Sequence, residues 1–308
     1  MSRIQRQNIS MPPLGLSVNY FHPIARELTT AWIQNEQVGG YLNNLAGRYG
    51  GLEPRMNLRT GSTGPTWTQT HNARGASMYP RGRSLYFDGA DYATSPHCNA
   101  YSWSASLPFS AYVWYKINGG TNELLLDKLE GSTTYRGWQI LQIQTAGSEN
   151  MCISLIYDNA SSDSIARQTT NEYNDDKWHG SLFTYDGSLY RTGFHIYTDG
   201  IEDTLQYGNA GPITADITNS QDLNIGRRRS SDSLYLTGSL GLVYIWKREL
   251  KYQEAILLHD DPLCIMQPLY ARVPYTTVVG GTYYDRAKLV NAGAFGSITR
   301  GGYVNAST

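Results

Sequence analysis

Cysteine is scarce in this chain of 308 residues, and its spacing excludes several kinds of site. The three cysteines are Cys98, Cys152 and Cys264, and no two of them form a Cys-x-x-Cys pair. This spacing argues against a zinc site built from cysteine pairs and against a dense disulfide framework. The odd count indicates assembly in a reducing compartment.

Charge of one sign and long apolar segments are also missing. The formal net charge is −1 and charged residues make up 17% of the chain, so no long-range field favours nucleic acid or an anionic membrane. No apolar run approaches the roughly 18 residues that a membrane-spanning helix needs. Residues 1–7 contain Arg3 and Arg6 but no apolar segment typical of a secretory signal peptide. We therefore expect no nucleic acid binding, no membrane insertion and no signal-dependent export.

Common catalytic signatures are absent as well. The chain has no Gly-x-Ser-x-Gly nucleophile elbow, no phosphate-binding Walker loop and no His-Glu-x-x-His pair. A serine-hydrolase, nucleotide-dependent or zinc-protease mechanism therefore has no support in the sequence.

The abundant residues favour β-structure. Tyrosine occurs 24 times against 6 phenylalanines, and glycine 31 times, a composition that suits pleated surfaces and turns. Residues 109–117 alternate with period 2, which predicts a strand with an apolar face and a face that carries Tyr112 and Trp114. Asp186-Gly187 and Asp199-Gly200 predict tight hairpin turns. Shorter strands of the same kind are predicted at 139–144, 152–157, 181–185 and 194–198.

Several segments in order resemble a known family. Phe87-Asp88-Gly89-Ala90-Asp91-Tyr92, Trp178-His179 and the Gly238–Trp246 strand resemble the laminin-G-like branch of the concanavalin-A-like lectin/glucanase superfamily, of the type found in tailed-bacteriophage virion proteins. The resemblance spans roughly residues 23–268. It implies an all-β fold in which two antiparallel sheets of about six or seven strands form a jelly-roll β-sandwich. Gly180, after the Trp-His pair, departs from the family pattern.

The chain is expected to have three parts. Residues 1–24 contain Pro12-Pro13 and Pro23 and predict an extended N-terminal arm. Residues 25–268 form the laminin-G-like sandwich, and a short helix at 250–259 ends before Asp261-Pro262. Residues 269–308 are a glycine-rich C-terminal tail, either a disordered end or a segment that orders against a neighbouring subunit of a homo-oligomer. Tyr283 and Tyr284 lie in a part of the tail suited to strand addition and are candidate partner-binding residues.

The resemblance directs attention to acidic residues, because glycosidases of the superfamily use paired carboxylates. Glu123, Asp127 and Glu130 form the only comparable cluster. In a regular strand Glu123 and Asp127 share a face but lie roughly 13 Å apart, while Glu130 points the other way. We therefore expect no catalytic residues here and interpret the cluster as a solvated strand end.

Two histidines and two aspartates have both structural and ligand-binding interpretations. His179 and His195 lie beside aromatic residues in strands, where a hydrogen-bonded structural histidine is the more frequent role than a metal ligand or general base. Calcium is the cofactor that the family resemblance makes possible, with Asp88 and Asp91 as candidate ligands. The Asp-Gly pair is first of all a hairpin signal, so the turn interpretation is favoured.

Binding surfaces are the remaining possibility. Arg227-Arg228-Arg229 is the densest positive patch, predicted either as a solvated loop or as a contact for an acidic partner or phosphate. Sugar binding needs exposed aromatic rings beside hydrogen-bonding side chains, and Tyr112 and Trp114 meet that condition only if their sheet face is exposed. Under the loop of residues 50–83 they would be core instead.

The sequence thus predicts a non-catalytic virion structural or accessory protein of a tailed bacteriophage, assembled in the host cytoplasm. Its place would be capsid decoration or a tail-associated position, and its partners itself, other virion proteins and host surface glycans. The alternatives are a carbohydrate-binding adhesin module of a host-recognition fibre and, third, a glycan hydrolase or lyase.

Overall fold

A computed structural model describes residues 16–34, 39–47, 55–59, 64–69, 83–120, 122–131, 134–145, 147–206, 211–268, 282–284 and 303–305. The chain divides into two units, Met1–Leu269 and Tyr270–Thr308. In the second unit the described elements are β20 (Thr282–Tyr284) and β21 (Tyr303–Asn305), which pair antiparallel. All other elements belong to the first unit.

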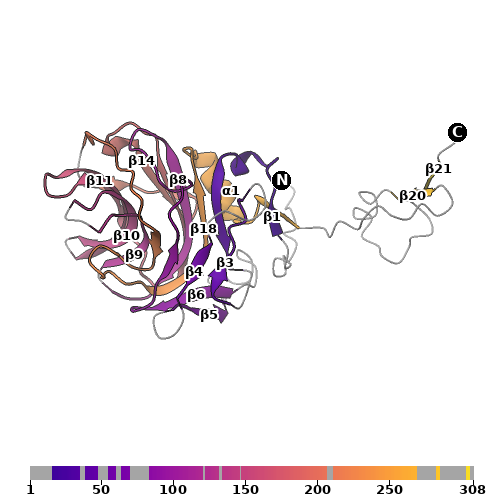
Figure 1. The fold of residues 1–308 in the computed structure, drawn as a ribbon, viewed down its shortest axis with the longest axis horizontal. Helices are drawn as coiled ribbons and strands as arrows, with labels where there is room; N and C mark the ends of the chain where they lie inside the picture. The colour runs from indigo at the N-terminus through magenta and orange to yellow at the C-terminus, as the bar shows by residue number, and fades with distance from the viewer. Residues whose placement is uncertain are drawn as a thin grey trace. The chain divides into compact units, whose positions relative to one another are not determined.

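The first unit is a sandwich of two antiparallel sheets, which confirms the predicted fold class (Figure 1). Its nine-stranded sheet has the order β16-β12-β11-β10-β9-β17-β7-β4-β3. The strands of this sheet, in chain order, are β3 (Tyr41–Leu42), β4 (Met56–Leu58), β7 (Ala93–Ser95), β9 (Asn122–Asp127), β10 (Gly137–Thr145), β11 (Ser148–Asp158), β12 (Asp163–Glu172), β16 (Leu205–Gln206) and β17 (Leu223–Ile225).

The eight-stranded sheet has the order β15-β14-β13-β8-β18-β6-β5, and β2 also pairs with β18. Its strands are β2 (Leu28–Ile33), β5 (Thr66–Gln69), β6 (Arg83–Asp88), β8 (Phe109–Ile117), β13 (Trp178–Tyr185), β14 (Phe194–Thr198), β15 (Ile201–Glu202) and β18 (Thr237–Trp246). Both sheets are larger than expected because short strands, such as β3 and β15, lengthen the edges.

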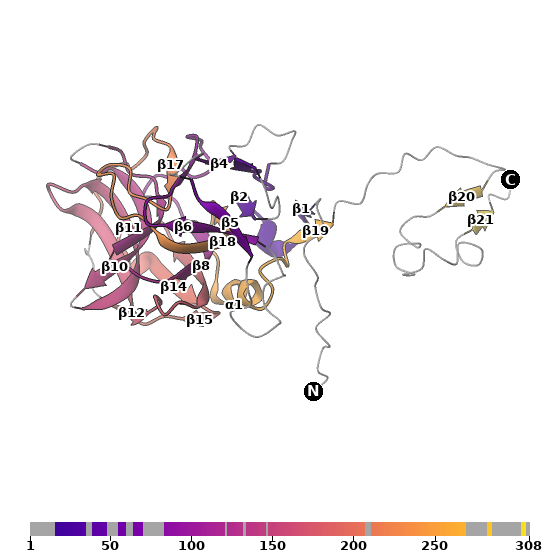
Figure 2. The ribbon, with the colours of Figure 1, turned by 90° about the horizontal axis from the view of Figure 1, so that it is seen from below.

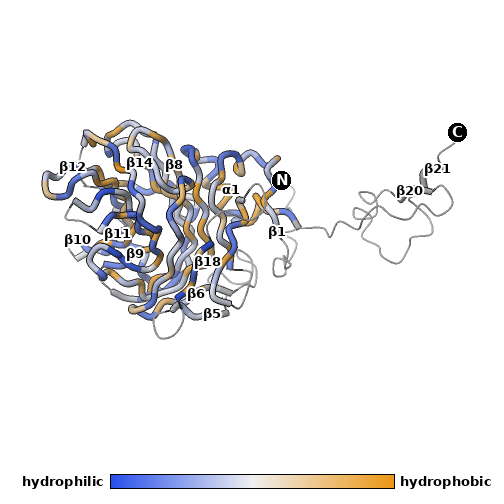
Figure 3. The backbone as a smooth tube through the Cα atoms, in the orientation of Figure 1, coloured by the Kyte–Doolittle hydropathy of each residue, from blue (hydrophilic) through white to orange (hydrophobic). Residues whose placement is uncertain are grey.

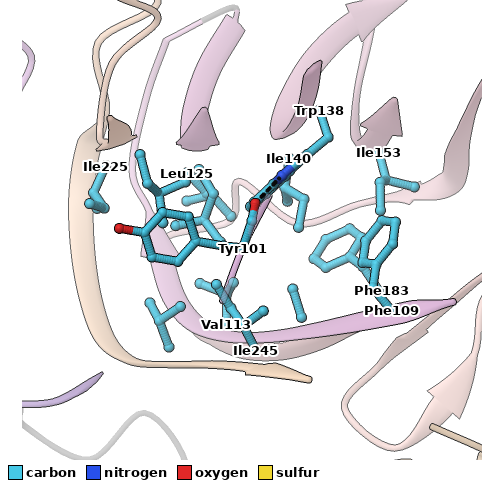
Figure 4. Close-up of a cluster of buried hydrophobic side chains, with 14 of the residues drawn as sticks. Tyr101, Phe109, Val113, Leu125, Trp138, Ile140, Ile153, Phe183, Ile225 and Ile245 are labelled. Carbon is cyan, nitrogen blue, oxygen red and sulfur yellow. Dashed lines mark hydrogen bonds between the residues drawn. The ribbon is translucent and has the colours of Figure 1, made fainter. Parts of the chain in front are cut away.

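The main core lies between the two sheets. The predicted apolar face of β8 is confirmed, since Phe109, Val113 and Tyr115 are buried there. Trp103 stacks between Phe109 and Trp138, with ring centroids 3.9 and 4.4 Å away. The indole Nε1 of Trp138 donates to the Tyr101 carbonyl oxygen at 2.9 Å, so a buried polar group is satisfied within the core (Figure 4).

A third layer covers the other face of the eight-stranded sheet. It consists of η1 (Pro23–Ala25), α1 (Tyr252–Asp260) and a two-stranded ribbon of β1 (Leu16–Val18) and β19 (Met266–Pro268). The remaining 3-10 helix, η2 (Arg191–Gly193), precedes β14. Figure 2 shows α1 beside β8, β14 and β18. Figure 3 shows that hydrophobic and hydrophilic residues both occur along the strands of the two sheets.

This third layer corrects two expectations from the sequence, one about the N-terminal arm and one about Tyr112 and Trp114. Leu16, Val18 and Ile24 are buried against the sheet, so the expected N-terminal arm is packed at these positions, whereas Tyr20 and Phe21 between them are exposed. Tyr112 is 1% exposed and Trp114 is 3% exposed in the same cluster, and the Tyr112 hydroxyl donates to the Leu258 carbonyl oxygen at 3.4 Å. The condition for a glycan surface at Tyr112 and Trp114 is therefore not met, because α1 and the N-terminal segment bury both rings.

The packing around Gly180 explains why glycine stands here in place of the residue expected from the family pattern. It lies on β13 directly opposite Trp114 of β8. A Cβ at this position would lie 2.3 Å from the Tyr112 hydroxyl oxygen and 2.5 Å from Trp114 Cε3. Glycine is thus required where two large rings fill the space beneath α1.

We predict that Gly180→Ala lowers the free energy of unfolding by about 1–3 kcal/mol, since the added methyl group displaces buried rings. Chemical denaturation monitored by tryptophan fluorescence measures the change. Gly119→Ala is the matched control, because a Cβ at Gly119 meets nothing within 4 Å. Equal stability of the two variants would contradict the packing described.

Candidate functional site

A bulge in β9 separates the two acids that the sequence placed on one face. The pairing of β9 with β10 shifts at Leu125, which leaves Leu125 and Leu126 both facing the core. Leu124 and Asp127 consequently point to the outer face of the nine-stranded sheet, and Glu123 points between the sheets. The prediction that Glu123 and Asp127 share a face is wrong for this reason.

Glu123 links the two sheets at one end of the sandwich. It is 1% exposed, and its Oε2 accepts a hydrogen bond from the Thr237 backbone N–H at 3.1 Å. Its Oε1, and Oε1 of the cross-strand neighbour Gln142, have no partner within the described structure. Burial raises the pKa of Glu123 to about 8, against the opposing effect of the Thr237 hydrogen bond. Burial thus favours the neutral form of the Glu123 carboxyl group.

Asp127 is buried beneath the loop between β17 and β18. It is 0% exposed and accepts hydrogen bonds from the N–H groups of Arg229 at 3.0 Å and Leu129 at 3.3 Å. Burial raises its pKa to about 7, although the Arg229 N–H and the Arg228 charge act in the opposite direction. Glu130 contacts neither Glu123 nor Asp127 in the hydrogen bonds described here, and it accepts a hydrogen bond from the Thr134 hydroxyl at 2.5 Å. Neither Glu123 nor Asp127 is thus a solvated strand-end group.

The three consecutive arginines have separate structural contacts. Arg227 donates to Asp232 at 2.7 Å and its guanidinium carbon lies 3.4 Å from the Tyr92 ring centroid. Arg228 donates to Gln139 Oε1 at 2.7 Å across the outer face of the nine-stranded sheet. Arg229 supplies its backbone N–H to Asp127, and its side chain contacts Gln221. These contacts hold the β17–β18 loop against the sheet. The contact of the arginines with an acidic partner or phosphate stays a prediction.

Asp88 and Asp91 organise the turn between β6 and β7. Asp88 accepts from the Ala90 N–H at 2.9 Å, and Asp91 accepts from the Asp88 N–H at 3.2 Å. Gly89 between them has a φ of +91°, which suits glycine. Burial is the main cause that raises the pKa of Asp91. Both carboxylates thus have turn contacts, and calcium binding stays a prediction.

His179 on β13 contacts the bend that precedes its own strand and the turn that follows β14. Its Nε2 lies 2.9 Å from Asp175 Oδ1 and its Nδ1 lies 3.0 Å from Asp199 Oδ2. Burial lowers the pKa of His179, but the hydrogen bonds to Asp199 and Asp175 outweigh it and raise the pKa overall. His195 forms a partly exposed pair with Glu202 at 2.8 Å. These contacts agree with the structural interpretation of both histidines.

Tyr283 and Tyr284 lie in β20, but their side chains fall outside the described residues. Within the described ranges, no three His, Cys, Asp or Glu side chains gather as a metal site would require. Among the described helices, none has the length and apolar character needed to cross a membrane.

The arrangement that sugar binding requires occurs on β3, β4 and β7 instead. Tyr41, Asn57 and Thr94 are successive register partners across these strands. Leu42, Met56, Leu58 and Ala93 face the core, so the three polar side chains project from the outer face. Tyr41 is 44% exposed, Asn57 is exposed and Thr94 is half-buried. An exposed aromatic ring therefore lies beside an amide and a hydroxyl.

This row continues across the sheet beneath the β17–β18 loop. The next register partners are Asn224, Asp127, Gln139 and Ser154. Asn224 Oδ1 and Ser154 Oγ are buried and have no hydrogen-bond partner in the described part of the molecule. The whole row of polar residues forms a polar stripe across the sheet. Its solvent-exposed end consists of Tyr41, Asn57 and Thr94, which we call the outer-face row. Figure 1 shows β3 and β4 side by side.

The sequence holds little that points to the outer-face row. β3 has two residues and β4 has three, too few for a countable period-2 pattern. The only signal is the alternation of Arg55, Asn57 and Arg59 with Met56 and Leu58, within a stretch otherwise rich in loop residues.

Comparison with known families agrees with this architecture. A laminin-G-type family model, described as "Concanavalin A-like lectin/glucanases superfamily", matches residues 87–255. The chain belongs to this superfamily. A search among curated proteins finds no match. The superfamily assignment confirms the family that the sequence motifs resembled.

Similar solved structures show the same fold. The binding domain of Paraclostridial Mosquitocidal Protein 1 aligns with a TM-score of 0.56 at 10% identity, covering 77% of this chain and 52% of that one. The binding domain of botulinum neurotoxin serotype G gives 0.52 at 15%, covering 75% and 50%. A botulinum neurotoxin type C structure gives 0.53 at 13%, covering 84% and 54%. This chain therefore spans about half the length of the structures it matches.

We predict that Glu123→Gln changes how stability depends on pH. The pKa of Glu123 rises from 4.5 to about 8 on folding, so wild-type protein loses stability relative to the variant as pH rises from 4.5 through 8. The expected difference in the free energy of unfolding between pH 4.5 and pH 9 is on the order of 4 kcal/mol. Urea denaturation across this range measures it.

Glu172→Gln is the control, because Glu172 is exposed on β12. Its pH profile should parallel that of the wild type. A Glu123→Gln profile that also runs parallel would show that Glu123 is ionised at no cost in the folded protein.

Proposed function

We propose that this chain is a non-catalytic, glycan-binding accessory protein of a tailed-bacteriophage virion, in a capsid-decorating or tail-associated position. The observation that carries the binding function is the outer-face row, in which the exposed ring of Tyr41 adjoins Asn57 and Thr94 on a rigid sheet. Aromatic surface with a few placed amide and hydroxyl groups is the usual composition of a small-molecule site.

The non-catalytic part of the proposal rests on the placement of the acids. Glycoside hydrolysis requires two carboxyl groups that flank one bond. The bulge in β9 puts Glu123 between the sheets and Asp127 on the opposite side of its strand. Both are also covered by protein, at 1% and 0% exposed. They cannot act on one substrate bond together.

The comparisons support binding as the function that this fold serves. The binding domain of botulinum neurotoxin DC, solved in complex with rat synaptotagmin II, aligns with a TM-score of 0.53 at 12% identity. For the similar botulinum neurotoxin type C, cell entry is dependent upon interaction with two ganglioside molecules. Those partners belong to those proteins, and the shared fold supports a receptor- or glycan-binding role here.

The virion setting rests on the branch of the family that the motifs resemble. Within the described residues, Leu16 and Pro268 are register partners in the β1–β19 ribbon. Many copies on a particle make a weak glycan site effective through avidity. The alternative setting is an adhesin module of a host-recognition fibre.

We predict that Tyr41→Ala and Asn57→Ala each weaken binding on a printed array of bacterial polysaccharides. Loss of the ring contact or of the amide hydrogen bonds costs about 1–2 kcal/mol, or about tenfold in affinity. Tyr252→Ala is the matched control, since Tyr252 is 43% exposed on α1 against 44% for Tyr41.

The control variant should bind as the wild type does. Absence of binding to any glycan on the array, or an equal loss in Tyr252→Ala, would refute the outer-face row as the ligand surface.

We further predict that removing residues 270–308 converts a closed homo-oligomer into a monomer while the sandwich stays folded, because the division between the two units falls at residue 269. Light scattering coupled to size-exclusion chromatography measures the mass, and circular dichroism checks the fold. A truncated chain with the mass of the full-length assembly would exclude the tail as the oligomer contact.

A further inference from the structure

Two arginines flank Asn57 on β4. Arg55 precedes the strand and Arg59 follows it, so that residues 55, 57 and 59 alternate with the core residues Met56 and Leu58. All three side chains therefore project outward from the outer face. The two arginines are separated by roughly 13 Å along the strand. Arg55, Asn57 and Arg59 are all exposed.

Each arginine lies over a tyrosine ring. The Arg55 guanidinium carbon is 4.5 Å from the Tyr41 centroid, and that of Arg59 is 4.9 Å from the Tyr92 centroid. The Tyr92 ring also carries Arg227 at 3.4 Å. Stacking uses the flat face of a guanidinium and leaves the N–H groups at its edge directed away from the ring. These stacking contacts position the arginines and do not themselves use hydrogen-bond donors.

The carboxylates near this surface already have other partners. Asp232 pairs with Arg227 at 2.7 Å and accepts from the Tyr235 hydroxyl at the same distance. The Asp127 carboxylate is buried and bound by backbone N–H groups. Over the described ranges Arg55 and Arg59 enter no ion pair. The outer-face row is thus flanked by two stacked, exposed cations in a chain whose formal net charge is −1.

We infer that the outer-face row, together with Arg55 and Arg59, binds an acidic glycan. This inference rests on the proposed function and names its ligand class. The planar N–H edge of a stacked arginine matches a carboxylate or a sulfate in a bidentate hydrogen-bonded pair. Asn57 and Thr94 between and beside the arginines match the neutral hydroxyl groups of the same sugar chain.

The same features favour a glycan over duplex nucleic acid. Nucleic acid binding depends on neutralising many phosphates along a continuous positive surface. Here two arginines have no ion-pair partner among the described residues, Asn57 lies between them on β4, and Tyr41 and Thr94 lie beside Asn57 on the neighbouring strands. That pattern suits acidic groups spaced along a chain that is otherwise rich in hydroxyl groups.

The test is an array of acidic polysaccharides, each printed beside its neutralised form. Carboxylated polymers are paired with their carboxyl-reduced forms, and sulfated polymers with their desulfated forms, so that the two sources of negative charge are separated. Full-length wild-type protein should bind at least one acidic polymer about tenfold more tightly than its neutral form. This preference should weaken as salt rises from 50 to about 300 mM.

The double variant Arg55→Gln/Arg59→Gln should lose the preference for the acidic form while keeping its melting temperature. Arg55→Lys/Arg59→Lys, which keeps charge but not the bidentate edge, should retain part of it. Arg26→Gln is the control, since the Arg26 side chain is 79% exposed and pairs with Glu27 elsewhere on the protein.

The outcomes separate the two claims. Equal binding of acidic and neutral forms, or an unchanged preference in Arg55→Gln/Arg59→Gln, would overturn the acidic-glycan inference and leave glycan binding intact. Tighter binding of a duplex DNA probe than of every polysaccharide would also overturn it. No binding to any spot would overturn the proposed function and this inference together.

Discussion

Burial of both faces of the eight-stranded sheet is the constraint on which the rest of the structure depends. One face packs against the nine-stranded sheet, and the other packs beneath α1, η1 and the β1–β19 ribbon. Trp114 and Trp246 on the covered face are at most 3% exposed. Since apolar burial is the dominant favourable term in folding, this sheet serves stability. The part of this sheet around β8 and β18 is therefore closed to ligands, whereas the outer face of the nine-stranded sheet carries exposed side chains at β3 and β4.

The outer face is itself divided by the β17–β18 loop. Arg228 and Arg229 fasten this loop to Gln139 and Asp127, which closes the middle of the polar stripe. The part that stays accessible is the β3, β4 and β7 end, where Tyr41 and Asn57 are exposed. A bulge of one residue in β9 has a comparable effect, because it removes Glu123 from the face that carries Asp127. A local irregularity in one strand and the position of one loop thus decide what chemistry this face of the sheet can support.

Strict alternation made part of this structure predictable. The period-2 pattern of 109–117 gave the correct core face of β8, and the ordered motifs gave the superfamily. The fate of Tyr112 and Trp114 depended on contacts with residues 16–25 and 250–265, and no local pattern records which distant segment covers a face. The β9 bulge was equally hidden, because Leu124, Leu125 and Leu126 are interchangeable in hydropathy. Tyr41 and Asn57 lie in strands too short to show periodicity, so only their register with Thr94 shows that the three residues are neighbours.

Backbone amide hydrogen exchange, measured on the full-length protein with and without a saturating bound polysaccharide fragment, tests the central claim most directly. The account predicts that added protection is concentrated at residues 41–42, 56–59 and 92–95, with little change in α1 or β14. Protection centred on α1 and the β14–β15 hairpin, with none at β3 and β4, would contradict it and place the ligand surface on the other side of the sandwich.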